Sequence, residues 1–399
     1  MRRTRVMVAV LAVAGAITLI SGSADAITPT EPMAPTSVAV TPGVGTVTVS
    51  WDPVAGNHVI YSVTSSPTGL ACTVRKTSCL IRDLVSTPYS FAVTASSKKL
   101  GTSPPSSSSP PLDPHLVLVV AGQSNASGVE SFNPAPDSGI DYLAPPFANG
   151  ADTHDLITWE PWFVLQGLGA TPVPLDTPQQ ILYSPNTVTV FGPEIGLARQ
   201  LWTDTGRPVT IVKAAYEGTD LAVNWAPNDR GAPPDGLFPA MVAKVRSVMA
   251  TDAASGQFDV LGGVYWYQGE SDAGNPSHAK GYQKKLNKFI AALRKELPMV
   301  ASAPVILAKE DVTANVGYLE SQGNLTATEA ASILQGNREV RAADDWAVAS
   351  LGHVVEVDTA DLARNGPSDV LSGTDIHLSN VSELSLGQEL AKASENLLP

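Results

Sequence analysis

The stretch LVLVVAGQSNASG, residues 116–128, decides the fold of the larger part of this chain. Its five consecutive large aliphatic residues predict a strand buried on both faces, as in a parallel sheet covered by helices. The run then stops in Gly, Gln, Ser and Asn, which favour a tight turn. Such a turn places Ser124 at the end of a buried strand, where it is either a nucleophile or an ordinary turn residue.

Apolar runs of the same kind recur along the chain and alternate with helical patterns. Further strands are predicted at 209–216, 258–268, 304–310 and 352–358. Helices are predicted at 193–202, 236–250, 281–297, about 327–348 and 381–398, the last with Asn380 as its N-cap. This alternation predicts an α/β fold with a doubly wound parallel sheet, whose active site lies at the carboxyl ends of the strands.

Two more of these predicted strands also end in small and polar residues. YEGT (216–219) completes one strand, QGESD (268–272) completes another, and DIH (375–377) precedes the last predicted helix. Ester hydrolysis by a serine needs a base, an acid that orients the base, and donors for the developing oxyanion. Of the six histidines, only His377 combines an adjacent acid with a loop that enters a helix. These residues are therefore candidates for one catalytic site.

Five motifs in the region 115–399 together resemble the SGNH hydrolases, and within them the sialate O-acetylesterase and acetylxylan esterase group, carbohydrate esterase family six. They are AGQSN (121–125), FGPEIGLARQL (191–201), KAAYEGTDL (213–221), YQGESDA (267–273) and DIHLS (375–379). The resemblance implies a flavodoxin-like three-layer sandwich. It also implies an enzyme that removes acetyl groups from a carbohydrate without a metal or other cofactor.

The resemblance assigns Ser124 as the nucleophile and His377 as the general base. It places the backbone N–H groups of Ser124 and Gly218 and the side chain of Gln268 in the oxyanion hole. Ser127 is a rival serine, but it lacks the position directly after the strand. Seen alone, Ser124 and Gly218 are also compatible with simple turn roles.

The orienting acid has two candidates, because the chain departs from the pattern of its relatives at this point. Many relatives carry an aspartate three residues before the histidine, whereas here position 374 is threonine and Asp375 lies two before. Glu270, in the QGE motif, is the competitor, and a backbone carbonyl could also orient the base. Gln123, Asn125 and Trp225 are expected to contact the substrate; Trp225 lies in a polar loop, NWAPND, after a strand end.

The N-terminal residues 1–26 have the pattern of a secretory signal peptide. They combine a basic start (MRRTR), an apolar run of about 15 residues and a small-residue site, ADA (24–26). Such a run is shorter than the roughly 20 residues that span a bilayer, and no later segment is long and apolar enough. The chain is therefore predicted to be secreted, with no membrane span.

Residues 27–102 show short alternating runs, such as TVTVSW (46–51) and YSFAVTA (89–95), which predict a small all-β sandwich. This region resembles a fibronectin type III module, with Trp51, Leu84 and Tyr89 as its core aromatic and aliphatic positions. Such modules are usually spacers or adhesive units, and this one could associate with glycan or cell wall. In an exported chain, Cys72 and Cys79 are expected to form a disulfide, since no nearby histidine or CxxC spacing supports a metal or redox pair.

The segment 103–114, rich in Pro and Ser, is predicted to be a semi-rigid linker that holds the two domains apart. The net charge of −13 disfavours nucleic acid and anionic membrane surfaces as partners. An acetylated carbohydrate suits this charge better. Two other functions stay open: a lipase or arylesterase of the same superfamily, and a non-catalytic carbohydrate-binding surface protein that keeps the fold.

Overall fold

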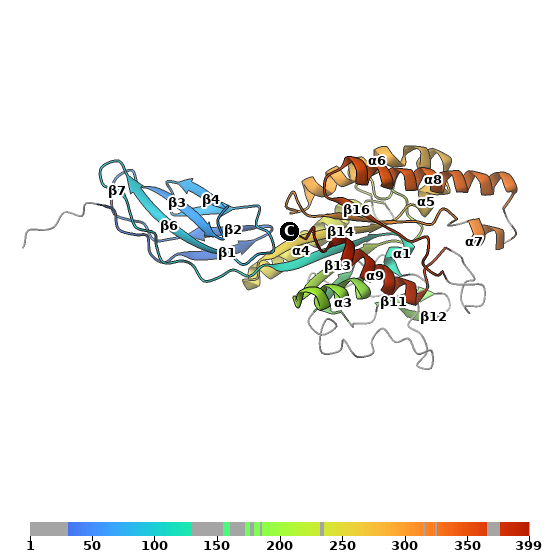
Figure 1. The fold of residues 1–399 in the computed structure, drawn as a ribbon, viewed down its shortest axis with the longest axis horizontal. Coiled ribbons are helices and arrows are strands. Elements are labelled where there is room, and N and C mark those ends of the chain that lie inside the picture. The colour runs from blue at the N-terminus through green and yellow to red at the C-terminus, as the bar shows by residue number, and fades with distance from the viewer. Residues whose placement is uncertain are drawn as a thin grey trace, which may run out of the picture.

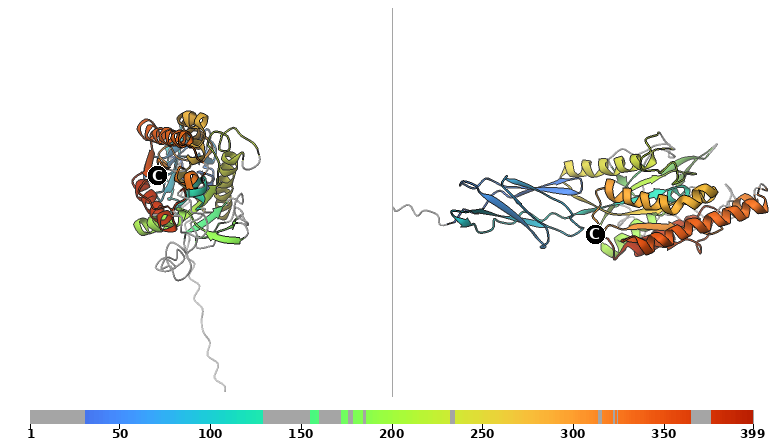
Figure 2. Two further views of the ribbon diagram at one scale, coloured as in Figure 1. Left: turned by 90° about the vertical axis from the view of Figure 1, so that its right-hand side faces the viewer. Right: turned by 90° about the horizontal axis from the view of Figure 1, so that it is seen from above.

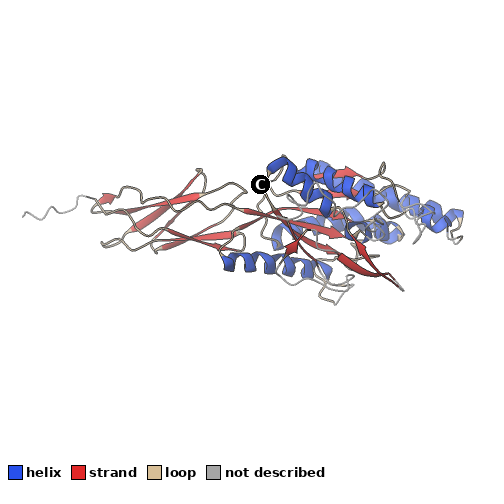
Figure 3. Ribbon diagram, turned by 90° about the horizontal axis from the view of Figure 1, so that it is seen from below, coloured by secondary structure: helices blue, strands red, loops and turns tan. Residues whose placement is uncertain are grey.

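The computed structural model describes residues 31–128, 155–159, 172–175, 179–183, 186–231, 235–313, 316–321, 323, 325–364 and 376–398. Two parts lie end to end (Figure 1), a small one built of strands and a larger one in which helices cover a sheet (Figure 3). The predicted signal peptide lies outside the described residues. Within them, no helix has the length and hydropathy needed to cross a bilayer.

The small part is an antiparallel sandwich of two sheets. One sheet has the order β1 (Ala39–Gly43), β2 (Thr46–Ser50), β5 (Ser78–Ile81), and the other β4 (Ala71–Val74), β3 (Ile60–Ser66), β6 (Ser90–Ser97), β7 (Gly101–Thr102). Alternate residues face inward around Trp51 and Tyr61, whose ring centroids lie 5.3 Å apart. The predicted disulfide between Cys72 and Cys79 is confirmed, and it joins the two sheets because it links β4 to β5.

The Pro/Ser segment lies along β6 instead of holding the domains apart. Ser103, Ser106 and Ser109 recur at every third residue, which is the repeat of the polyproline II helix that proline favours. Each backbone N–H donates to a carbonyl of β6, and each hydroxyl accepts from an N–H of β6, at 2.8–3.0 Å. The predicted semi-rigid linker therefore does not hold the two domains apart, because hydrogen bonds fix the segment along β6.

The larger part contains a seven-stranded sheet. Its order is β10 (Val173–Pro174), β9 (Leu156–Trp159), β13 (Val209–Ala215), β8 (His115–Gly122), β14 (Asp259–Tyr267), β15 (Val305–Lys309), β16 (Val354–Asp358). Every neighbouring pair is parallel except β10 with β9. A separate hairpin consists of β11 (Gln179–Tyr183) and β12 (Asn186–Val190). The predicted α/β class with a large, mostly parallel sheet is confirmed.

Helices cover both faces of this sheet. Successive residues of β8 point to opposite faces, so alternate residues of this strand pack with different helices. Val117 and Val119 pack with α4 (Leu237–Ser255), α6 (Pro276–Glu296) and α8 (Ala327–Ser350). Leu116 and Leu118 pack with α3 (Glu194–Thr205) and α9 (Asn380–Ser394). The shorter helices are α1 (Ser124–Ser127), α5 (Glu270–Ala273) and α7 (Val316–Ser321). The unbroken aliphatic run of β8 is thus explained by burial on both faces.

The last helix has a different N-cap from the predicted one. Ser379 is the cap, and its hydroxyl accepts from the backbone N–H of Ser382 at 3.3 Å. The Asn380 side chain instead accepts from the N–H of the next residue, Val381. The prediction failed because Asn and Ser are about equally good caps, and adjacent candidates cannot be separated by residue type alone.

The sandwich packs against the amino-terminal edge of the large sheet (Figure 2). Phe258 and Val260, at the start of β14, belong to the same apolar cluster as the sandwich core. The Arg207 guanidinium also donates to the Ser86 carbonyl of the sandwich at 2.7 Å. The two parts are therefore in contact, and the sandwich lies at the edge opposite the carboxyl ends of the strands.

The crossing of α3 and α9 requires glycine. A Cβ on Gly387 would lie 2.1 Å from the Pro193 carbonyl oxygen, and one on Gly196 would lie 2.1 Å from the Leu384 carbonyl oxygen. We expect Gly387→Ala to destabilise the protein by about 1–3 kcal/mol, because the helices must separate. Gly281→Ala in α6 is the matched control, since no atom lies within 4 Å of its added Cβ.

Gly281→Ala should stabilise by about 0.5–1 kcal/mol, the gain from replacing glycine inside a helix. Urea unfolding of the two variants measures the difference directly. Equal stability of the two variants would contradict the close packing of α3 against α9.

Two titratable groups at the amino-terminal edge predict how stability depends on pH. Burial raises the pKa of Asp259 to about 8, and burial together with Arg207 lowers the pKa of His115 to about 4. Between pH 4 and 6.5 the two effects oppose each other, because the folded state favours protonated Asp259 but neutral His115. Above pH 6.5 only the Asp259 effect remains, so stability should fall as its carboxyl loses the proton.

We expect the contribution of Asp259 to the free energy of unfolding to fall by at most about 2 kcal/mol between pH 6.5 and 8. Asp259→Asn should make the wild-type fall smaller by this amount, since an amide stays neutral, whereas other buried acids such as Glu310 keep their own contribution. Urea unfolding at pH 6.5, 7.25 and 8 measures the slope for both proteins. A variant that keeps the full wild-type slope would show that another group is responsible.

Candidate active site

Three strand ends that carry the sequence motifs lie side by side at the carboxyl edge of the sheet. In register, Gly122 at the end of β8 pairs with Ala215 of β13 and with Tyr267 of β14. The residues that follow each strand therefore emerge at one edge, as the parallel arrangement requires. This register brings together AGQSN, YEGT and QGESD, which are far apart in the sequence.

The turn after β8 depends on Gly122. Its φ is +144°, and a Cβ here would lie 1.9 Å from the carbonyl oxygen of Tyr267. That carbonyl accepts from the N–H of Gln123 at 3.0 Å, so β14 holds the turn closely. Ser124 then begins α1. The Ser127 hydroxyl donates back to the Ser124 carbonyl at 2.9 Å, which supports a turn role for this rival serine.

Asn125 fastens the serine turn to the histidine segment. Its amide group donates to the Ile376 carbonyl at 3.1 Å, and its carbonyl oxygen accepts from the Leu378 N–H at 3.0 Å. These two backbone groups flank His377, which is itself buried. The residue next to Ser124 in sequence thus binds the segment on both sides of the candidate base, across 251 and 253 positions of the chain.

Asn125 also binds Glu270, one of the two candidate acids. Its amide donates to Glu270 Oε1 at 2.8 Å, and the Asn125 side chain is fully buried. Its hydrogen bonds with Glu270, Ile376 and Leu378 all join protein groups, so its predicted contact with substrate stays a prediction. Asp375, the other candidate acid, lies outside the described residues.

A second buried carboxyl lies behind Glu270. Burial, reinforced by the charge of Glu270, raises the pKa of Glu310 well above its usual range. A Cβ on Gly269 would lie 2.6 Å from Val340 Cγ1 and 3.3 Å from the Glu310 carboxyl carbon, so a larger residue between the two acids would crowd both side chains.

Gly218 is exposed to solvent at the same edge of the sheet. Its φ is +67°, and a Cβ would have no atom within 4 Å, so the requirement for glycine comes from the backbone conformation. Thr219 fixes this turn, because its hydroxyl donates to the Tyr216 carbonyl at 2.6 Å. An exposed backbone in this conformation suits the predicted oxyanion donor, although no contact tests that role.

Gln268 is buried at the end of β14 and is held on several sides. Its Nε2 donates to Asp272 Oδ2 at 2.8 Å, to the Thr219 carbonyl at 3.1 Å and to Gln123 Oε1 at 3.3 Å. The Tyr282 hydroxyl donates to the backbone carbonyl of Gln268 at 2.8 Å. The Gln268 amide group thus donates to protein acceptors, and the place of Gln268 in the oxyanion hole stays a prediction. Contact of Gln123 with the substrate also stays a prediction.

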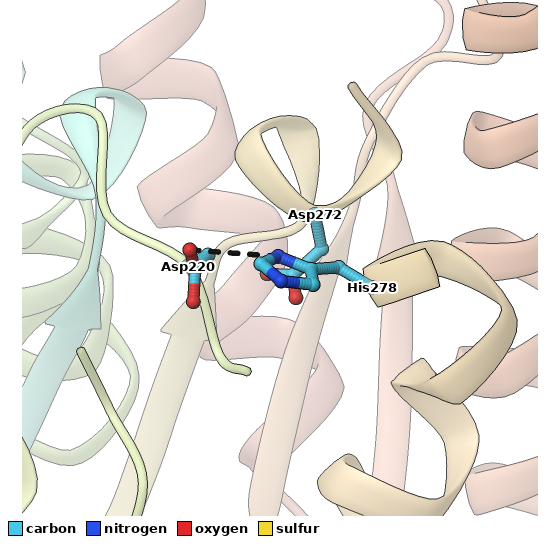
Figure 4. Close-up of side chains that lie close together, drawn as sticks. All are labelled: Asp220, Asp272 and His278. Atoms are coloured by element: carbon cyan, nitrogen blue, oxygen red, sulfur yellow. Dashed lines mark ion pairs between the residues drawn. The ribbon is translucent and has the colours of Figure 1, made fainter. Parts of the chain in front are cut away.

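Asp272 connects the turn around Gly218 to the QGE motif, a role that the sequence reasoning missed. The same oxygen that accepts from Gln268 also accepts from the N–H of Leu221 at 2.7 Å. Burial raises the pKa of this carboxyl to about 6. Asp272 also lies beside Asp220 and His278 (Figure 4), three groups that could hold a metal ion.

Lys213 is a second residue that sequence reasoning missed. Its buried ammonium donates to the Ser127 carbonyl at 2.9 Å and pairs with Glu194 at 2.8 Å. The lysine therefore supports the end of the serine turn from the neighbouring strand. The signal was present, since a charge inside the apolar run VTIVKAA must have a partner when buried, and Glu194 lies in the FGPEIG motif.

The prediction that Trp225 faces a sugar is wrong. Its side chain is 0% exposed and lies edge-on to Trp266, with ring centroids 5.0 Å apart. Its indole N–H donates to the Thr219 hydroxyl at 3.0 Å. Trp225 therefore belongs to the core under the turn that carries Gly218, because the polar residues around it in sequence do not prevent the ring from packing inward.

Comparison with known proteins places the chain among the enzymes, in the class of carboxylic ester hydrolases. Residues 114–396 match the model of the family described as carbohydrate esterase, sialic acid-specific acetylesterase, and the chain belongs to this family. The resemblance inferred from the five motifs is thereby confirmed. No curated protein matches the sequence.

Three solved structures are among those that this chain resembles. A protein from Arabidopsis thaliana is 21% identical, with 72% of this chain and 100% of that one covered and a TM-score of 0.48. A carbohydrate acetylesterase from Xanthomonas citri is 17% identical, with 91% and 75% covered and a TM-score of 0.44. NanS is 16% identical, with 71% and 98% covered and a TM-score of 0.47.

Proposed function

We propose that this protein is a secreted serine esterase that hydrolyses O-acetyl groups on a carbohydrate. The observation that carries the proposal is the Asn125 clamp, which fastens the turn of Ser124 to both sides of His377. A nucleophile and a base that come from opposite ends of the domain are thereby held at one edge of the sheet. Membership of the carbohydrate esterase family supplies the substrate class.

In the proposed reaction, the Ser124 hydroxyl attacks the acetyl carbonyl carbon while His377 takes its proton. The backbone N–H groups of Ser124 and Gly218, with Gln268, stabilise the oxyanion of the tetrahedral intermediate. His377 then gives the proton to the sugar oxygen as the acetyl C–O bond breaks. Water, activated by the same histidine, releases acetate and restores the serine.

The proposal assigns Asp375 as the acid that orients His377, with Glu270 as its competitor. Glu270 is buried and reaches the histidine segment through Asn125, which supports at least a positioning role. Asp375→Asn and Glu270→Gln separate the two, because each removes a charge and keeps the size of the side chain. We expect the larger fall in kcat, up to about 10⁴-fold, from Asp375→Asn.

We also propose that the N-terminal sandwich is a fibronectin type III-like spacer. It packs at the edge of the large sheet opposite the candidate site, so its residues cannot form the acyl pocket. The predicted signal peptide, with a disulfide between the two sheets, supports export to an oxidising compartment.

Acetate release by the wild-type protein tests the proposed activity. The substrates are 4-nitrophenyl acetate, acetylated xylan and O-acetylated sialic acid, with 4-nitrophenyl octanoate to detect a lipase. We expect release from acetyl esters and a preference for one acetylated glycan. Higher kcat/KM on the octanoate would favour a lipase, and saturable glycan binding without release from any ester would favour a binding protein.

A further inference from the structure

Three side chains from different elements converge next to the candidate site. Asp220 follows β13, Asp272 belongs to α5, and His278 lies in the first turn of α6. One potential ligand atom from each lies within 4.8 Å of the other two, and His278 Nδ1 is 3.6 Å from Asp220 Oδ2 (Figure 4). Ligands about 2.0–2.2 Å from one ion lie at most about 4.4 Å apart, so small side-chain movements would bring the three atoms into coordination distance.

The buried carboxylate of Asp272 gives an independent indication of a missing partner. The residue is 0% exposed, and its Oδ2 accepts the two hydrogen bonds from Leu221 and Gln268. Its Oδ1 is also buried but has no hydrogen-bond partner among the described residues. An unpartnered carboxylate oxygen in the interior is costly, and a cation bound at this cluster would satisfy it.

The charges of the cluster also favour a cation. Asp220 and Asp272 bring two carboxyl groups to the cluster beside one imidazole, and carboxylate oxygens attract a cation. The side chains of Asp220 and His278 are 21% and 26% exposed, so an ion can enter from solvent and keep water as further ligands. Asp272 alone is fully enclosed, which gives the site one rigid ligand and two adjustable ones.

We propose that Asp220, Asp272 and His278 bind one divalent transition-metal ion of the zinc type, with water completing its coordination. An imidazole nitrogen together with two carboxylates suits such ions, whereas Ca²⁺ prefers an all-oxygen set. The ion would fasten the segment after β13 to α5 and α6. It lies outside the proposed reaction, which needs no metal, so the inference goes beyond the proposed function and does not depend on it.

Such an ion would act on the position of the Gly218 turn. Asp220 lies two residues after Gly218, and Asp272 already links Leu221 to Gln268 through Oδ2. Binding to the other oxygen of Asp272 would hold this turn and the QGE motif at a fixed separation. Its main effect would be on stability, because a ligand that binds only the folded state raises the melting temperature.

The test is binding of Zn²⁺ by the full chain after removal of metal with EDTA. Isothermal titration with ZnCl₂ at pH 7.5 should show one equivalent and a raised melting temperature, with much weaker binding of CaCl₂. Asp220→Asn and His278→Gln should each weaken binding more than about tenfold, since even outer partners of a metal ligand cost that much. Asn at position 220 can still accept from the Val223 N–H, so the turn is preserved.

His58→Asn is the matched control, because His58 is exposed in the sandwich and asparagine tolerates its φ of +57°. This control should bind Zn²⁺ like the wild type. Absence of a bound equivalent in the wild type would overturn the proposal. Equal affinity in the wild type, Asp220→Asn and His278→Gln would also overturn it, since the ion would then lie elsewhere.

Discussion

Replacement of Ser124 by alanine is expected to lower kcat on acetyl esters by more than about 10⁴-fold, with the fold intact. Loss of the nucleophile removes the acyl-enzyme route, and only binding and oxyanion stabilisation remain. The fold should survive because Ser124 contributes its backbone carbonyl, not its side chain, to the hydrogen bond with Ser127. Initial rates on 4-nitrophenyl acetate, with circular dichroism for the fold, measure both.

Ser127→Ala is the control for this prediction. The two serines lie in the same four-residue helix, but the Ser127 hydroxyl donates to the Ser124 carbonyl and is used within the turn. Its replacement should lower kcat by less than about tenfold, the effect expected from losing one neutral hydrogen bond. A Ser124→Ala enzyme within a few-fold of the wild type would refute the assignment of the nucleophile.

Replacement of Asn125 by alanine is expected to lower kcat by about 10²-fold. The variant loses the contacts to Ile376 and Leu378 that flank His377, and Glu270 loses a donor. A shift of the base by about 1 Å is enough to cost this much. Stability should also fall, by about 1–3 kcal/mol, because buried polar groups are left without partners.

Asn337→Ala separates the loss of geometry from the loss of stability. Asn337 is also fully buried and donates to a backbone carbonyl, that of Val312, at 2.8 Å, and it lies in α8, outside the motifs that carry the candidate residues. The Asn337→Ala variant should have a lower free energy of unfolding than the wild type and keep kcat within about twofold of the wild-type value. If both asparagine variants lose the same activity at equal stability, Asn125 has no special role at the site.

Local patterns in the sequence were sufficient for the α/β class and for three strand ends that carry chemistry. The aliphatic run at 116–120 can be buried on both faces only between two helix layers, and the parallel register then brings the following turns to one edge. Residue type and position after a strand are properties of a few neighbouring residues. The candidates Ser124, Gly218 and Gln268 could therefore be found without knowledge of the packing.

Other features depend on partners distant in sequence, and only the tertiary structure decided them. Trp225 lies in a polar stretch, yet packing against Trp266 puts it in the core. The Pro/Ser segment has few apolar residues, yet every third residue of it, a serine, forms hydrogen bonds with every second residue of β6.

The same holds for the contacts of single side chains at the site. Asn125 fits a substrate-binding role by its position, but its donors and acceptor meet protein groups 145 to 253 residues away. The neighbours of Asp272 likewise come from three elements. Sequence pattern determines which face of an element is buried, whereas the partner of one polar atom is determined by how the elements pack.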